Sequence, residues 1–334
     1  MRAYGRRGVL ALAAAFLAVA GCSDTPVEQP RQSPVAAASP TSTAEKPPIT
    51  PGEAREVFTA YVATDAANRG AGFQWYARDQ VTGGRATLTM AEYDAHRFPT
   101  PHKWGAPTVW VPKLAAGDRN PWFSALAERD GRPAIVTFVG QGADWLLTSV
   151  AVLEPGQGPP AVELDADGYA TPLSSTDKSV AISPTFMAPL HASVAEAGPE
   201  GIAAGLIAPG PYTTETADRI DADRKRWKGL GYDYDSIFSA GELRTFALRT
   251  TDGGALVQYS LNQSTSITNR LDKKGLGIPV PEELRWLEPS LWAQLSLKTS
   301  EMHQYATAVP PIDSTRPAAV IAHDSGVYQA KADN

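Results

Sequence analysis

The chain has 334 residues, of which 30 are Lys or Arg and 36 are Asp or Glu, so its formal net charge is −6; 43% of its residues are hydrophobic. A net acidic chain lacks the basic surface that nucleic-acid binding requires and the polybasic patch that docks on anionic lipid headgroups. Its single cysteine excludes an intramolecular disulfide and a cysteine metal cluster, so hydrophobic cores must provide the stability.

The first 22 residues have the organisation of a signal peptide. Three arginines come first, and the uncharged apolar run that follows over residues 9–19 is shorter than the roughly 20 residues that cross a membrane. Val19-Ala20-Gly21-Cys22 then resembles the lipobox of bacterial lipoproteins. The resemblance implies that Cys22 is lipidated and that two or more acyl chains hold the protein at the outer face of the cell membrane. The alternative is an ordinary secreted protein with a chance cysteine. Arg6-Arg7 also fits a loose twin-arginine pattern, so the export route stays open.

Residues 23–48 are predicted to form a disordered linker. Prolines recur among Ala, Ser and Thr, and no aromatic residue is present, so the segment cannot bury enough surface to offset its chain entropy. At the rise of a polyproline helix such a segment reaches up to about 80 Å. We therefore expect a stretched spacer between the membrane and the folded part.

A first domain is predicted over residues 49–155. Thr50-Pro51-Gly52-Glu53 has the pattern of a capping box with proline in the first turn, and it predicts a helix that ends near residue 70. A looser region is expected from there to about residue 105. Four strands are then predicted at residues 108–111, 122–128, 134–139 and 145–153.

A segment rich in Pro and Gly at residues 156–182 predicts a boundary, and a second domain is expected over residues 183–334. Helices are predicted from Ser183-Pro184 and over residues 214–230. The predicted strands lie at residues 243–249, 255–262 and 295–309, followed by a last hairpin that joins residues 320–323 to 327–330.

The two halves share a sequence pattern. Residues 125–138 and 247–259 both read Ala-Leu, three residues, Asp-Gly, a short loop, Ala, two aliphatic residues, any residue and an aromatic residue. A duplication predicts an α+β fold of two tandem helix-plus-antiparallel-sheet domains. A curved sheet around a long helix buries the apolar faces of both, which is the cone shape of nuclear-transport-factor-like and cystatin-like folds.

A family resemblance rests on the lipobox, the linker and several aromatic motifs: Val109-Trp110-Val111-Pro112, Pro121-Trp122-Phe123 and Trp145. Together they resemble a family of actinobacterial surface lipoproteins that carry a domain of unknown function, over most of residues 49–330. The resemblance implies surface localisation and brings no catalytic residues.

The candidate chemistry lies on one predicted strand. Glu301 and His303 share a strand face with Tyr305 because side chains alternate along a strand. If this face lines the interior of a cone, the carboxylate and the imidazole form an acid–base pair; otherwise the face meets solvent. The sequence has no phosphate-binding loop and no nucleophile elbow, and we expect no cofactor and no metal.

These observations predict a lipid-anchored, extracytoplasmic and non-enzymatic binding or scaffold protein of the cell envelope. Its expected partners are the membrane, through the lipid on Cys22, and an envelope protein or a small ligand, but no nucleic acid. The first alternative is a cone-type hydrolase or isomerase that uses Glu301 and His303. The second is a passive spacer in the envelope.

Overall fold

A computed structural model describes residues 47–201, 203–270 and 277–334 of the chain. The predicted signal peptide, Cys22 and nearly all of the predicted linker lie outside the described residues. Residues 45–334 cluster as one compact unit. No helix within the described ranges is long and apolar enough to span a membrane.

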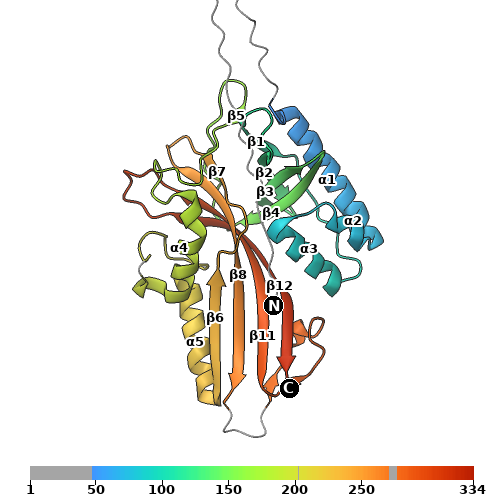
Figure 1. The fold of residues 1–334 in the computed structure, drawn as a ribbon, viewed down its shortest axis with the longest axis vertical. Helices are drawn as coiled ribbons and strands as arrows, with labels where there is room; N and C mark the ends of the chain where they lie inside the picture. The colour runs from blue at the N-terminus through green and yellow to red at the C-terminus, as the bar shows by residue number, and fades with distance from the viewer. Residues whose placement is uncertain (1–46, 202, 271–276) are drawn as a thin grey trace, which may run out of the picture. The chain divides into compact units, whose positions relative to one another are not determined.

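In each half of the described chain, helices come first and strands follow (Figure 1). The α-helices are α1 (Pro51–Ala71), α2 (Gln74–Arg78), α3 (Gly83–Ala95), α4 (Pro184–Ala197) and α5 (Thr214–Leu230). The strands of the first half are β1 (Thr108–Pro112), β2 (Trp122–Arg129), β3 (Arg132–Gln141), β4 (Asp144–Leu153) and β5 (Tyr169–Ala170). Those of the second half are β6 (Tyr232–Ser239), β7 (Phe246–Arg249), β8 (Ala255–Asn269), β9 (Ile278–Pro279), β10 (Trp292–Ala293), β11 (Ser296–Val309) and β12 (Ala319–Asp333). The 3-10 turns are η1 (Gly198–Glu200) and η2 (Glu282–Leu284).

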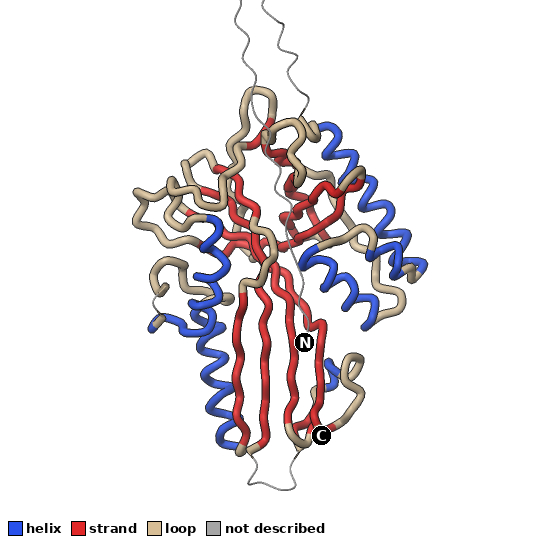
Figure 2. The backbone as a smooth tube through the Cα atoms, viewed as in Figure 1, coloured by secondary structure: helices blue, strands red, loops and turns tan. Residues whose placement is uncertain are grey.

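Ten strands form one sheet in the order β5-β1-β2-β3-β4-β12-β11-β8-β6, with β7 paired to β8 (Figure 2). The pairing is antiparallel except between β1 and β5. The two halves meet where β12 pairs with β4, through Ala322 opposite Leu153 and His323 opposite Val152. The predicted α+β class is confirmed. The two tandem domains and the cone-shaped folds are not confirmed, because strands from both halves join a single sheet.

We call strands β1–β5 the first half-sheet, and β6–β8, β11 and β12 the second half-sheet. Helix α1 covers the outer face of the first half-sheet. Its capping box forms as predicted: the Thr50 hydroxyl accepts from the amide of Glu53, and the Glu53 carboxylate accepts from the amide of Thr50. The apolar stripe of the helix carries Phe58 and Tyr61, whose rings pack edge-on against Phe138 of β3. Burial of this stripe supplies most of the helix's stability, since propensity alone is weak.

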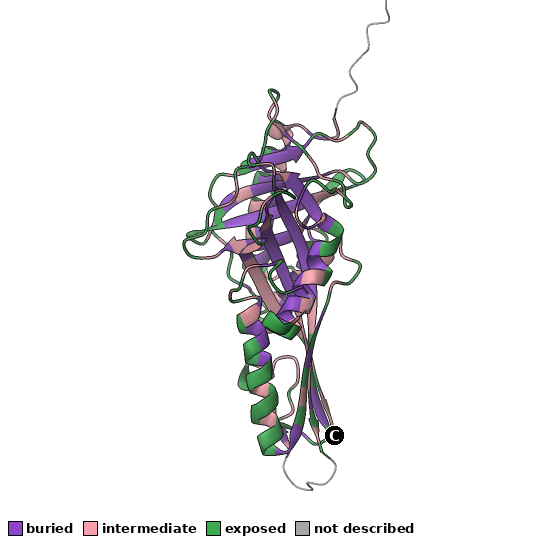
Figure 3. Cartoon of the chain, turned by 90° about the vertical axis from the view of Figure 1, so that its left-hand side faces the viewer, coloured by how far each residue is buried: buried purple, intermediate pink, exposed green. Residues whose placement is uncertain are grey.

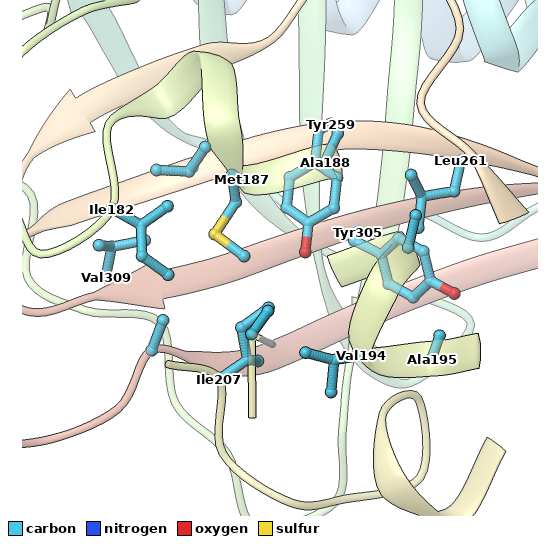
Figure 4. Packing of buried hydrophobic residues seen from close by; sticks show 14 of the residues in the cluster. Ile182, Met187, Ala188, Val194, Ala195, Ile207, Tyr259, Leu261, Tyr305 and Val309 are labelled. Atoms are coloured by element: carbon cyan, nitrogen blue, oxygen red, sulfur yellow. The ribbon is translucent and has the colours of Figure 1, made fainter. Parts of the chain in front are cut away.

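Helix α4 covers the outer face of the second half-sheet. Met187 and Val194 of this helix pack on Tyr259 of β8 and Tyr305 of β11 (Figure 4). Helix α5 lies beside β6, and its outer side is exposed (Figure 3). The helix at residues 214–230 has the predicted bounds.

The inner faces of the two half-sheets pack on each other. Trp110 and Trp122 of the first half meet Phe246, Leu248 and Leu256 of the second in one buried cluster, with the Trp122 and Phe246 rings 5.1 Å apart. Alternation along each strand therefore sends one set of side chains to a helix and the other set to the opposite half-sheet. Where the half-sheets overlap, the layers are helix, sheet, sheet and helix; α3 packs on the inner side of β11 and β12 beyond that overlap.

Two predicted elements are wrong. The region from residue 70 to 105, expected to be loose, contains α2 and α3. The last hairpin is one continuous strand, because Asp324-Ser325-Gly326 pairs with β11 instead of turning: Gly326 lies opposite Met302 and Ser325 opposite His303. An Asp-Ser-Gly sequence permits a turn, but pairing with a 14-residue neighbouring strand overrides that preference.

Candidate functional site

The predicted pair Glu301 and His303 lies on the side of β11 that faces α4 and α5. The nearest approach is 3.8 Å, between His303 Nε2 and Glu301 Oε1. Each group has a closer partner: the Ser325 hydroxyl donates to Glu301 Oε1 at 2.8 Å, and His303 Nδ1 lies 3.0 Å from His323 Nε2. Burial raises the pKa of Glu301 and lowers that of His303 to about 4. The structure thus brings the pair together, with the imidazole neutral at pH 7.

Packed rings surround this pair. The Tyr305 ring stacks on both His303 and His323, with ring centroids 5.8 and 4.7 Å away. The nearby His191 is held by the Tyr212 carbonyl at 2.7 Å and the Tyr259 hydroxyl at 2.9 Å. The run His323-Asp324-Ser325 does not form a catalytic triad, because the Ser325 hydroxyl bonds a carboxylate and not a histidine. This arrangement is a satisfied polar interior.

A cavity of about 390 Å³ opens at the other side of β8, between the two half-sheets. Its lining comes from the start of α3, the β3–β4 hairpin, β8 and the loop that precedes β7. Glu301, His303 and Tyr305 do not border it. Its volume lies in the range of about 300–1,000 Å³ that ligand pockets occupy. We refer to it as the inter-sheet cavity.

A buried polar cluster lies beside this cavity. The hydroxyls of Ser124 and Thr137 are 2.8 Å apart, and the Gln258 amide bridges them, accepting from Thr137 at 2.6 Å and donating to Ser124 at 2.8 Å. Ser149 lies opposite Thr137 in the β3–β4 ladder, so both side chains share a face. The Ser149 hydroxyl is buried at the cavity and has no hydrogen-bond partner among the described residues.

Helix α3 begins at the same cavity. Gly83 and Gly84 line it, and Thr82, the N-cap residue, forms no side-chain cap hydrogen bond. Gly83 has a φ of +54°, and a Cβ there would lie 2.7 Å from Thr148 Oγ1. A Cβ on Gly84 would lie 3.0 Å from Ser260 Oγ. The two glycines therefore let the helix start approach the sheet closely.

Two arginines reach the rim of the cavity. Arg244 donates to the Asn120 carbonyl at 2.8 Å and lies over the Phe246 ring at 4.9 Å. Burial lowers its pKa, yet a guanidinium stays charged near neutral pH. Arg119 and one carboxylate, Glu242, also line the cavity. The Asp118 carboxylate also acts on Arg244, so the rim carries charges of both signs around a shaped space.

The sequence did not point to this cavity. Ser149 and Gln258 lie on predicted strands, but their approach depends on how the half-sheets pack, which periodicity does not encode. The usable signal was Thr82-Gly83-Gly84, a cap-type residue and two glycines ahead of an apolar helical run. Within the described ranges no group of three or more His, Cys, Asp or Glu residues is placed to hold a metal ion.

Comparison with known proteins gives a family match. The model of a family described as domain of unknown function (DUF8094) matches residues 45–332. An uncharacterized lipoprotein of Streptomyces coelicolor is 27% identical over 294 residues, which cover 81% of this chain and 79% of the relative. An uncharacterized lipoprotein of Streptomyces avermitilis is 27% identical over 234 residues, covering 61% of this chain and 67% of the relative. No solved structure matches the chain.

Proposed function

This chain belongs to the actinobacterial lipoprotein family with the domain of unknown function DUF8094, and from that premise we propose that it is a lipid-anchored, non-enzymatic binding protein of the cell envelope. The lipid sits on Cys22 and places the folded part at the outer face of the membrane. The linker of residues 23–48 acts as the spacer. The folded part captures a small solute in the inter-sheet cavity.

The anchor is supported by the lipobox and by the lipoprotein names of both relatives. Replacing Cys22→Ala removes the thiol that would be acylated, so the protein is expected in the soluble fraction instead of the membrane fraction. Ser23→Ala is the matched control and should remain with the membrane. Membrane retention of the Cys22→Ala chain would contradict the anchor.

One observation carries the binding role: a cavity of about 390 Å³ between the half-sheets is lined by polar residues such as Ser149, Gln258 and Ser260. Polar groups on the wall of a space of ligand size can orient a solute that enters it.

A thermal-shift panel tests the binding role. The full lipidated chain in detergent is heated with phosphate, sulfate, succinate, glucose, glycine or spermidine. At least one solute is expected to raise the Tm of the wild type and not that of Gln141→Trp, which places a bulky ring at the cavity rim. Gln329→Trp, an exposed position on β12, is the matched control and should keep the shift. A panel without any shift would overturn the proposal.

The alternative is a hydrolase or isomerase that uses Glu301 and His303. The observation in its favour is a carboxylic acid with a raised pKa that lies 3.8 Å from a neutral imidazole. Turnover of chromogenic esters or glycosides by the wild type, lost in Glu301→Gln, would establish it and displace the binding role. The packed rings around this pair favour the non-enzymatic reading.

A further inference from the structure

We propose that a cluster of exposed aromatic side chains at the end of α1 docks on the surface of the lipid bilayer that holds the anchor. We call this cluster the aromatic patch; it consists of Phe73, Trp75, Tyr76 and Phe98. The inference rests on the lipid anchor of the proposed function and adds a second contact between the folded part and the membrane.

The aromatic patch leaves four large rings in solvent. The exposed fractions are 52% for Phe73, 74% for Trp75, 65% for Tyr76 and 58% for Phe98. The Phe73 and Tyr76 rings meet edge-on at 5.8 Å, and with Trp75 they border one open hollow of about 370 Å³. Apolar surface that is gathered in one exposed place marks an interaction site.

Two segments of the fold hold the patch together. Helix α2 follows α1 directly and carries Trp75 and Tyr76, and Figure 1 shows it at the end of α1 that lies away from the start of the described chain. Phe98 comes from the segment after α3 and packs against the same turn, since a Cβ on Gly72 would lie 2.9 Å from its ring. The rings are therefore presented by a packed corner of the fold.

The composition of the patch matches a membrane interface. Tryptophan and tyrosine accumulate at the level of the lipid headgroups, where the ring enters the apolar layer and its polar tip stays in water. The Arg78 guanidinium lies over the Trp75 ring at 5.9 Å, and that of Arg97 lies over the Phe98 ring at 5.4 Å. Arginine stems cover apolar surface while the charged head stays in water, as the headgroup layer requires.

Charges of both signs balance around the rings. Asp79 and Asp94 are exposed beside the two arginines, and the Asp94 carboxylate accepts a hydrogen bond from Gln74 Nε2 at 2.8 Å. The rings, and not a net charge, therefore provide the affinity. Docking of this kind does not need anionic lipid, which agrees with the net acidic composition of the chain.

The tether places the membrane within reach of the patch. Helix α1 spans 21 residues, about 30 Å, between the start of the described chain and the patch. The linker of residues 23–48 reaches up to about 80 Å, so the patch can lie on the bilayer that holds the lipid on Cys22. Anchoring keeps the folded part close to the bilayer, so a weak interfacial affinity is sufficient. The lipoprotein names of both relatives support a membrane as this partner.

Brominated lipids test the inference. The full lipidated chain is reconstituted in phosphatidylcholine vesicles with brominated acyl chains, and its tryptophan fluorescence is compared with that in unbrominated vesicles. Bromine quenches only at short range, so a folded part that is tethered without docking keeps its fluorescence. The wild type is expected to be quenched, and Trp75→Ser should lose most of this quenching. Trp292→Ser removes a tryptophan of β10 that is 53% exposed; it is the matched control and should keep the quenching.

The double variant Phe73→Ser/Tyr76→Ser separates docking from the loss of a fluorophore. It keeps Trp75 but removes two rings of the patch, so quenching should fall at least twofold. Its Tm should match that of the wild type, because both side chains are exposed. Wild-type quenching in the double variant would overturn the inference. An unquenched wild type would also overturn it and would leave a protein as the occupant of the patch.

Flotation of the same vesicles distinguishes this inference from the proposed function. A chain that floats with the vesicles but is not quenched keeps its anchor and overturns only the docking of the patch. A chain that does not float contradicts the anchor, and this inference falls with it. Solute binding in the inter-sheet cavity is tested separately by the thermal-shift panel.

Discussion

A network of buried charges joins α1 and α3 of the first half to β12 of the second half. Arg69 of α1 pairs with Asp65 at 2.9 Å and with Glu92 of α3 at 2.6 Å. Arg85 of α3 pairs with the same Glu92 at 2.6 Å and with Asp324 of β12. Both arginine side chains are 2% exposed, so each carboxylate compensates a charge that water does not reach. Glu92 is the centre of this network.

Glu92→Gln should therefore destabilise the fold strongly. Breaking a buried ion pair costs up to about 3–5 kcal/mol, and here Arg69 and Arg85 each lose one of two carboxylate partners. Urea unfolding followed by circular dichroism measures the loss. Glu56→Gln, an exposed position on α1, is the control and should change stability by less than about 0.5 kcal/mol.

The same network makes the stability of the fold depend on pH in the acid range. Burial opposes ionisation of Glu92, but Arg85 and Arg69 outweigh it and hold its pKa at about 2. Since the unfolded chain takes up the proton at higher pH, the contribution of Glu92 is present above about pH 4.5 and is lost as the pH falls toward 2. Glu92→Gln should flatten stability against pH in this window. An unchanged slope would contradict the assignment.

Two buried histidines make the stability of the fold depend on pH in a second, higher range. Burial lowers the pKa of His303 and of His191 to about 4, so both stay neutral in the folded protein while they protonate in the unfolded chain near pH 6.5. Stability should fall as the pH drops from about 6.5 to 4, by up to about 1.4 kcal/mol per pH unit for each histidine. Denaturant titrations at several pH values should show a shallower slope in His303→Asn and a wild-type slope in His96→Gln, the exposed control.

At the scale of elements, short sequence motifs predicted the helices and strands whose ends are determined by neighbouring residues. The capping box at Thr50 predicted the start of α1, and the predicted strands at residues 122–128 and 134–139 correspond to the β2–β3 hairpin. The uninterrupted strand β12 was missed because its Asp-Ser-Gly run also fits a turn, and only its pairing with β11 decides between the two.

The capping box gives a test with a control on the same helix. Thr50→Ala removes the hydroxyl that accepts from the Glu53 amide at 3.2 Å and should cost about 1 kcal/mol. Thr59→Ala removes an exposed hydroxyl that bonds the Arg55 carbonyl and should be neutral or stabilising, because alanine is the better helix former. Chemical denaturation compares the two; equal effects would contradict the capping role.

The candidate site was likewise predicted only where it depends on local sequence. Alternation along β11 predicted that Glu301 and His303 share a face, and they do. The sequence alone could not predict which side chains cover that face, because the rings that pack there come from distant residues such as Tyr212 and His323. The inter-sheet cavity was missed for the same reason: Gln258 meets Ser124 across 134 residues of chain.

At the scale of the whole molecule, the packing of one half-sheet on the other determines how the protein unfolds. The cluster around Trp122 and Leu256 is built from both halves, so neither half keeps an intact interior alone. Calorimetry should therefore show one cooperative transition for the folded part. Two separate transitions, one from residues 49–155 and one from residues 183–334, would support the tandem domains predicted from the sequence repeat.

The pairing of β4 with β12 also affects how the chain folds during its synthesis. Of the described strands, β12 is synthesised last, yet it joins β4 to β11. Until residues 319–333 are made, β4 has an unpaired edge and the earlier strands lack their closing partner. Open strand edges next to apolar surface invite aggregation and proteolysis. A chain cut short in synthesis is thereby marked for degradation, and only a translation product that reaches β12 closes its sheet.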